Sequence, residues 1–258
     1  MAAAAGFDHL IAGVDDLERA ADEWRRAGFT VTPRGRHIGW GTANYCIMFP
    51  NEYVELLGVL DPTKYLYGLD RFLADHGEGL LGVAFATTDP DETYRALEEI
   101  GQQGDPPKDL ARFLDLPEGT VEPRFHLVHP RDSKAFGVSA FFCRHLTPEL
   151  VRKPAWLDHP NGAVGIAEIE TNVPDLAGLA PRYQAIFGPS AVDQSPRRVC
   201  VQTGTTRVVL KTGTPAADRI TIKVRDLDAT DRWMKQADVA ALGSGLSING
   251  MQLTFVEA

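Results

Sequence analysis

Cysteine is scarce in this 258-residue sequence, and the three that occur, Cys46, Cys143 and Cys200, lie far apart. An odd number of distant cysteines excludes a disulfide framework and a cysteine-based zinc knuckle, and it favours a reducing compartment. Long hydrophobic runs are also missing: no stretch of about 18 apolar residues occurs, and no basic segment opens the N-terminus. We therefore expect a cytoplasmic protein with neither a membrane span nor a secretion signal.

Positive charge is in deficit, with 26 Lys and Arg residues against 35 Asp and Glu residues, a formal net charge of −9. This balance repels a phosphate backbone on average, and no dense basic stripe offsets it, so nucleic-acid binding is excluded. The hydrophobic content of 44% and the charged content of 24% are ordinary for a globular chain and exclude wholesale disorder. The expected partner is a small molecule, with no nucleic acid and no membrane.

The chain contains a repeat. An apolar strand, an acidic helix start and a later glycine stop recur along it, with strand ends at Val14, Thr87, Val173 and Val224. Such self-similarity predicts a repeated supersecondary unit. The expected fold class is α+β, with four βαβββ-like units in two halves and the third and fourth units trimmed; a generic alternating α+β chain is the alternative. In the first unit, strand-like runs follow the helix at residues 29–32, 43–49 and 53–60.

Composition also predicts the boundaries of the two halves. The repeat predicts that residues 1–146 form an N-terminal module pair, with units at about 6–60 and 80–145. Residues 147–162 contain three prolines and predict a rigid linker. Residues 163–258 are expected to form a degenerate C-terminal module pair.

Three short motifs together carry a family resemblance: Asp8-His9-Leu10, Gly41-Thr42-Ala43-Asn44 and Val54-Glu55-Leu56-Leu57. They resemble the glyoxalase-like branch of the vicinal oxygen chelate superfamily. The resemblance implies βαβββ modules that pair into curved, half-open mixed sheets. In active members a divalent metal lies in the cup of such a sheet, bound by the first and last strands of the paired modules.

The resemblance implies a ligand set when it is carried over position by position. It implies His9 and Glu55 in the first unit, with His145 as third metal ligand and Cys143 on the same strand face. Gly82 falls where another first-strand ligand would lie, which departs from a four-ligand pattern. The local sequence also allows structural roles without metal binding: a core histidine for His9, an outward edge-strand position for Glu55 and a strand-end surface histidine for His145.

The C-terminal half offers a poorer set of ligands. Its first-strand positions are Glu168 and Arg219, and its last strands contain Lys211 and Gln252. Because Arg219 places a fixed positive charge at a ligand position, we expect no metal there.

The resemblance and the residue types also indicate a substrate pocket. Glu55 and His37 are the candidate catalytic residues, with a turn histidine as the alternative for His37. Pocket candidates are Trp40, Asn44, Phe141 and Cys143, and core packing is the alternative for the aromatic residues and the cysteine.

Two classes of function follow. The first is a metal-dependent lyase, isomerase or ring-opening dioxygenase that acts on a small substrate with adjacent oxygens. Two imidazoles and one carboxylate suit Fe, Mn, Co, Ni or Zn, and the sequence does not choose among them. The second is a protein that binds a small molecule without chemistry and without metal, which the missing ligand at Gly82 favours. A homodimer and a monomer both stay open, since four modules can satisfy edge pairing within one chain.

Overall fold

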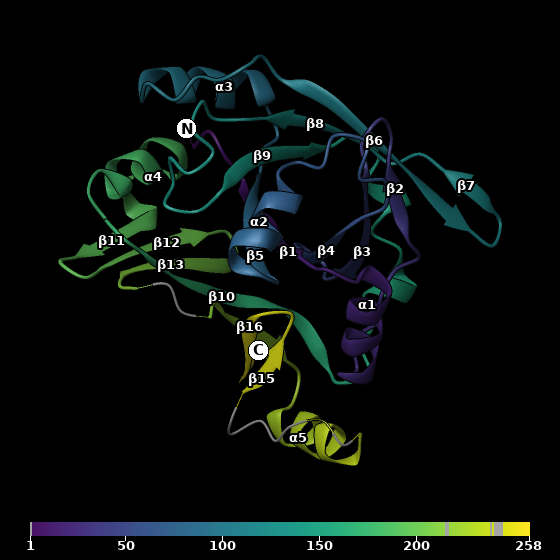
Figure 1. Cartoon of the computed structure of the whole chain (residues 1–258). Coiled ribbons are helices and arrows are strands. Elements are labelled where there is room, and N and C mark those ends of the chain that lie inside the picture. The colour runs from purple at the N-terminus through teal and green to yellow at the C-terminus, as the bar shows by residue number, and fades with distance from the viewer. Residues whose placement is uncertain (1, 215–216, 238, 240–244) are drawn as a thin grey trace.

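The computed structural model describes residues 2–214, 217–237, 239 and 245–258, which form two mixed β-sheets with helices on their faces (Figure 1). The strands of the first sheet are β1 (Gly6–Gly13), β2 (Gly35–His37), β3 (Thr42–Met48), β4 (Tyr53–Val59), β5 (Gly79–Ala86), β6 (Lys108–Leu116), β7 (Gly119–Val121), β8 (Arg124–Val128) and β9 (Ala140–His145). Its helices are α1 (Leu17–Arg26), α2 (Leu69–His76) and α3 (Pro90–Glu99).

The second sheet follows two short 3₁₀ helices, η1 (Pro148–Leu150) and η2 (Pro154–Trp156). Its strands are β10 (Ala163–Val173), β11 (Val192–Ser195), β12 (Arg198–Thr203), β13 (Thr206–Thr212), β14 (Arg219–Val224), β15 (Leu246–Ile248) and β16 (Met251–Glu257). Its helices are α4 (Leu179–Phe187) and α5 (Leu227–Gln236), with a third 3₁₀ helix, η3 (Pro189–Ala191).

The strand order confirms the predicted repeat. The first sheet runs β2-β3-β4-β1-β5-β9-β8-β6-β7 and the second runs β11-β12-β13-β10-β14-β16-β15. In both sheets two central strands lie antiparallel, β1 with β5 and β10 with β14, and each is parallel to the last strand of its own unit. The third unit is not trimmed, because β11, β12 and β13 follow α4, whereas only two strands follow α5 in the described part of the fourth unit.

Acidic caps begin the helices, as the sequence predicts. The side chains of Asp16, Asp89 and Asp226 accept hydrogen bonds from backbone N–H groups in the first turns of α1, α3 and α5. Each cap satisfies N–H groups that have no partner within the helix. Helices α2 and α4 differ, since they begin at Gly68 and Gly178 without a side-chain cap.

The prediction of a strand at residues 29–32 is wrong. Phe29 packs between the rings of Trp24 and His159, and the hydroxyl of Thr32 accepts a hydrogen bond from the backbone N–H of Cys46. The strand that follows α1 is instead β2, which pairs with β3 and also with β6. The β2–β6 pairing closes the first sheet on itself, with β7 extending from β6. The described strands of the second sheet have no such closing pair.

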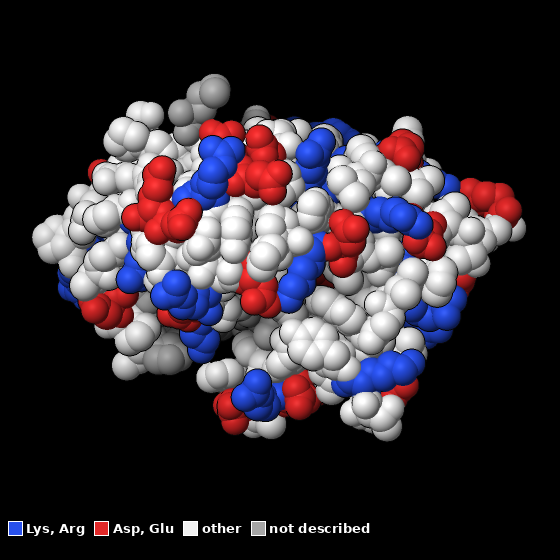
Figure 2. All heavy atoms as spheres, turned by 90° about the horizontal axis from the view of Figure 1, so that it is seen from above, with Lys and Arg blue, Asp and Glu red and all other residues white. Residues whose placement is uncertain are grey.

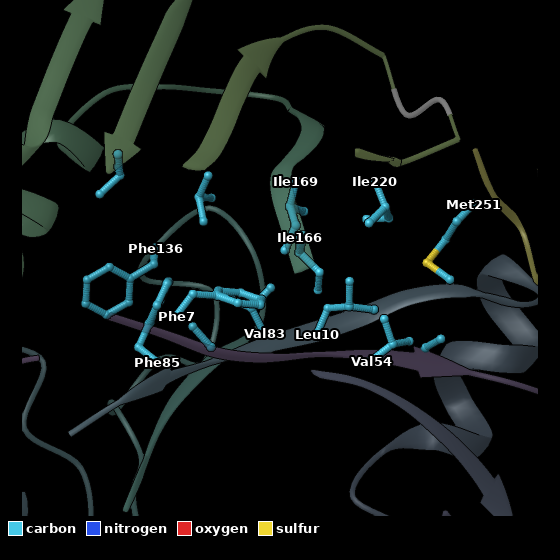
Figure 3. Close-up of a cluster of buried hydrophobic side chains, with 14 of the residues drawn as sticks. Phe7, Leu10, Val54, Val83, Phe85, Phe136, Ile166, Ile169, Ile220 and Met251 are labelled. Carbon is cyan, nitrogen blue, oxygen red and sulfur yellow. The ribbon is translucent and has the colours of Figure 1, made fainter. Parts of the chain in front are cut away.

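A shared core lies between the two sheets. Figure 3 shows apolar side chains of the first sheet meeting those of the second sheet across this core. The labelled contributors are Phe7, Leu10, Val54, Val83 and Phe85 on one side and Ile166, Ile169, Ile220 and Met251 on the other. Burial of this surface holds the halves together. The concave face of the first sheet therefore points away from the second sheet.

The linker predicted at residues 147–162 contains η1 and η2 and stays against the first sheet. Arg152 donates hydrogen bonds to the backbone carbonyls of Phe49 and Pro50. The division of the chain into two separate domains stays a prediction.

None of the helices that the structure describes is long and apolar enough to cross a membrane. On the face shown in Figure 2, basic and acidic side chains are interspersed, without a patch of one sign.

Candidate active site

Strands β1 and β4 bring His9 and Glu55 together. The two strands are parallel neighbours, with Ile11 opposite Glu55, and the side chains of His9 and Glu55 enter the concave face of the first sheet. His9 Nε2 lies 3.4 Å from Glu55 Oε2, and both side chains are buried, with Glu55 only 6% exposed. The two predicted ligands therefore share one face, and the outward edge-strand position for Glu55 is excluded.

Asp8 orients His9 from the other side of the ring. It is the extra residue of a β-bulge between β1 and β5, so its side chain turns back toward the histidine. Asp8 Oδ2 lies 2.6 Å from His9 Nδ1. Burial opposes ionisation of Asp8, but His145 and His9 outweigh it and hold the pKa of this carboxyl well below its usual value. An ionised Asp8 accepts the hydrogen bond from His9 Nδ1–H, and this bond orients the ring so that its Nε2 faces Glu55.

Two further side chains contact Glu55. Asn44 Nδ2 donates a 2.5 Å hydrogen bond to Glu55 Oε1, and this fixes the amide so that the buried Asn44 Oδ1 has no donor. His37 Nε2 lies 3.7 Å from Glu55 Oε1, and His37 Nδ1 lies 2.8 Å from the hydroxyl of Thr42. Burial lowers the pKa of His37 to about 4, so its ring is neutral at neutral pH.

We call the cavity around these groups the cup. Its lining residues are His9, Ile11, His37, Trp40, Asn44, Tyr53, Glu55, Leu57, Tyr67, Leu110, Arg112, Phe125, Leu127, His129, Phe141 and Cys143. Every predicted pocket residue is among them. Trp40, Tyr67, His129 and Phe141 form one side of the cup, which we call the aromatic wall. In it Tyr67 stacks on Trp40, and Phe141 stacks on His129.

Gly41, next to Trp40, allows a close approach of two backbone segments at the edge of the cup. A Cβ atom on Gly41 would lie 2.1 Å from the backbone carbonyl oxygen of Asp61, so only glycine fits there.

Arg112 is a site residue that the sequence analysis missed. It comes from β6, opposite His37 in the β2–β6 pair, and it is only 5% exposed. Its Nη1 donates a hydrogen bond to Cys46 Sγ at 3.4 Å, and the guanidinium lies over the ring of Phe125. Burial opposes the charge, but Cys46, Tyr53 and Glu55 outweigh it and raise the pKa of Arg112.

His145 lies apart from Glu55. Its Nε2 is 3.1 Å from Asp8 Oδ1, and its buried Nδ1 has no hydrogen-bond partner. Asp8, Cys143 and His145 together form a group whose ligand atoms lie within 4.8 Å of one another and could hold a metal ion. Arg152 Nη2 lies 3.8 Å from Asp8 Oδ1, a positive charge beside that group. The ligand roles of His9, Glu55 and His145 stay predictions.

The sheet register shows which second-unit positions correspond to His9 and Glu55. The β1–β5 pair is symmetric about Leu10 and Val83, so Gly82 corresponds to His9 and Ala84 to Ile11. Because Phe141 lies opposite Ala84 as Glu55 lies opposite Ile11, Phe141 holds the position of Glu55. A Cβ on Gly82 would lie 2.8 Å from the Ser139 carbonyl oxygen. Neither position offers a ligand atom.

Comparisons with known proteins agree with this geometry. A family model described as a glyoxalase-like domain matches residues 7–187. The chain belongs to this glyoxalase-like family. No curated protein matches the chain.

Three solved structures share the glyoxalase-like fold. A hypothetical protein from Staphylococcus aureus is 14% identical with a TM-score of 0.73, over 98% of this chain and 99% of that one. A xylose isomerase-like TIM barrel/4-hydroxyphenylpyruvate dioxygenase fusion protein is 16% identical with a TM-score of 0.58, over 92% of this chain and 39% of that one. A mutant of 4-hydroxymandelate synthase from Streptomyces coelicolor is 12% identical with a TM-score of 0.58, over 93% and 76%. At these identities the likeness is one of fold, and it places the chain in the vicinal oxygen chelate fold.

The second glyoxalase-like sheet uses its concave face differently. Glu168 occupies the position of His9 and forms an ion pair with Arg207, while Glu170 pairs with Lys211. The β10–β13 register places Val209 at the position of Glu55. Glu168 is then the one carboxylate at a ligand position, and its charge is already neutralised by Arg207, which disfavours a cation. The absence of a metal from this half stays a prediction.

Proposed function

We propose that this glyoxalase-like protein is a metal-dependent enzyme that acts on a small substrate with adjacent oxygens, through lyase, isomerase or dioxygenase chemistry. The observation that carries the proposal is the pair of metal-ligand atoms His9 Nε2 and Glu55 Oε2, 3.4 Å apart, with His9 Nδ1 held by Asp8. A buried carboxylate that faces an imidazole nitrogen needs a proton or a cation between the two groups. The donor set therefore fits a divalent cation, and the carboxylate–histidine arrangement is common around metal ligands.

His9 and Glu55 would hold the metal, and His37 stands next to them on the substrate side. A divalent metal there would polarise a carbonyl and stabilise negative charge on two adjacent substrate oxygens. The tautomer of His37 with Nδ1–H donating to Thr42 leaves its Nε2 free to accept a proton from substrate. The aromatic wall would exclude water from that transfer. Because Gly82 and Phe141 supply no ligand, open coordination positions remain for substrate oxygens.

Metal binding by matched glutamate variants tests the proposal. Protein purified without a histidine tag should bind Zn(II) or Mn(II) with one ion per chain in calorimetry, and Glu55→Gln and His9→Ala should weaken that binding strongly. Glu52→Gln is the control, because Glu52 is equally buried but accepts a hydrogen bond from the Ile166 backbone N–H outside the cup. Circular dichroism checks that each variant folds. Unchanged binding in Glu55→Gln would contradict the proposed site.

A second candidate function rests on the two second-unit positions without ligand atoms. Gly82 and Phe141 leave at most half of a four-ligand set, which favours a protein that binds a small molecule without chemistry. Wild-type protein that folds, binds a small aromatic molecule in the cup and takes up no metal in the same titration would support this function over the enzyme.

A further inference from the structure

Arg112 carries a buried charge without an ionic partner. No carboxylate of the described residues lies within 4.0 Å of its guanidinium, and its buried Nε has no hydrogen-bond partner. Among the described residues, the side chain of Arg112 donates one hydrogen bond, to a cysteine sulfur, which is a weak acceptor. Leaving a charge buried and unpaired is costly, so this arrangement needs a compensating group.

Glu55 lines the same cup and its charge favours the guanidinium, but its oxygens contact other residues. Oε1 accepts from Asn44, and Oε2 faces His9 Nε2. Neither Glu55 oxygen forms an ion pair with Arg112, so among the described residues the guanidinium keeps free N–H donors whether or not a metal is bound at His9 and Glu55. A planar N–H fork of this kind is well suited to a carboxylate.

The remaining surface of the cup indicates what such an anion is attached to. The aromatic wall offers ring faces of Trp40, Tyr67 and Phe141. Glu55 is a carboxylate that lines the cup, so one of its oxygens would accept a hydrogen bond from a hydroxyl group. A flat ring, a carboxylate and a neighbouring hydroxyl complement these three features.

We infer that the cup binds a small aromatic carboxylate with an oxygen adjacent to the acid group, and that Arg112 is the residue that selects for the negative charge. The carboxylate lies on Arg112, the ring lies on the aromatic wall, and the adjacent oxygen faces His9 and Glu55. The inference rests on the proposed function for the role of the metal, whereas the charge selection by Arg112 is independent of it.

Salicylate and salicylamide are the probes, because they have the same shape and differ in charge. Calorimetry on wild-type protein in the presence of EDTA should show salicylate binding about 10- to 100-fold more tightly than salicylamide, the range for a hydrogen-bonded charge. Arg112→Met should abolish this preference, and Arg112→Lys should retain part of it, because lysine keeps the charge but not the fork. Arg124→Met is the control: Arg124 is an exposed arginine that pairs with Glu122 outside the cup, and its loss should leave the preference unchanged.

Equal affinity of the two probes in wild-type protein, or no salicylate binding up to millimolar concentration, would overturn the inference. Either result would assign Arg112 a structural role against Cys46 and Phe125. The wild-type comparison also decides the question if Arg112→Met fails to fold. Because these titrations contain EDTA, their failure is distinguishable from failure of the metal site, which the Glu55→Gln titration measures separately.

Discussion

Asp8 connects two histidines that the sequence presents as unrelated. One of its oxygens lies 2.6 Å from His9 Nδ1 and the other lies 3.1 Å from His145 Nε2. The bulge at Asp8 makes this possible, because it turns the side chain of the residue preceding His9 toward the concave face. Asp8 is therefore a positioning residue for the proposed metal ligand His9.

Replacing Asp8 by Asn tests this positioning role. The amide can still accept from His9 Nδ1, but it no longer makes the imidazole more basic, so metal affinity should fall by about 10- to 100-fold. Calorimetric titration with Zn(II) measures the change. Asp109→Asn is the matched control, since Asp109 is an exposed carboxylate of β6. Equal affinities of the two variants would exclude a positioning role for Asp8.

At the scale of single residues, motif positions were predictable and long-range partners were not. The motifs led directly to His9, Asn44 and Glu55, which the structure brings together in one cup. The contact of His145 with Asp8, 137 residues away in sequence, depends on the bulge and the sheet order. Nothing local in the sequence signals either of these features.

At the scale of elements, β6 is the longest of the strands that the sequence analysis missed, and the reason is a local inversion of its pattern at Arg112 and Phe113. Its inward positions are Leu110, Arg112, Leu114 and Leu116, so a charged residue points inward. Phe113 points outward, is 37% exposed and packs against the Arg36 guanidinium. A strand with polar-in and aromatic-out positions hides the alternation that identifies a half-buried strand. Function accounts for the inversion if Arg112 binds an anion.

Two neighbouring substitutions test the register of β6. Phe113→Thr should change the free energy of unfolding by at most about 1 kcal/mol, because its side chain is outside the core. Leu114→Ala should cost about 2–5 kcal/mol, because Leu114 is fully buried. Urea unfolding followed by circular dichroism measures both. The reverse order of the two effects would show that the strand is turned over.

At the scale of the whole molecule, the repeat was predictable because each unit shows the same local signals: an apolar strand followed by an acidic helix start. The closure of the first sheet through β2 and β6 was not predictable, because it depends on a three-residue strand and on the missed β6. The packing of one sheet on the other was also not predictable. It follows from which side of each strand is apolar, and that requires the bulges in β1 and β10.

The linker docks on the first half of the chain through a buried histidine. His159 Nδ1 accepts a hydrogen bond from the Thr30 backbone N–H, and its Nε2–H donates to the Met48 carbonyl. These two bonds require the neutral ring. Burial lowers the pKa of His159 below its ordinary value of 6.5, while the charges of Asp158 and Arg225 act in opposite directions and pair with each other.

This linkage predicts a pH-dependent contribution of His159 to stability. The unfolded chain binds the proton more readily than the folded chain, so the contribution is fully present above about pH 6.5 and is lost as pH falls below it. His159→Gln should therefore cost about 1–3 kcal/mol at pH 8, the usual cost of a broken buried hydrogen bond, and less at pH 5.5. Urea unfolding of both proteins at the two pH values measures the difference. His76→Gln, at the exposed end of α2, is the control, and a cost for His159→Gln that does not decrease at the lower pH would show that the ring is not held neutral in the folded protein.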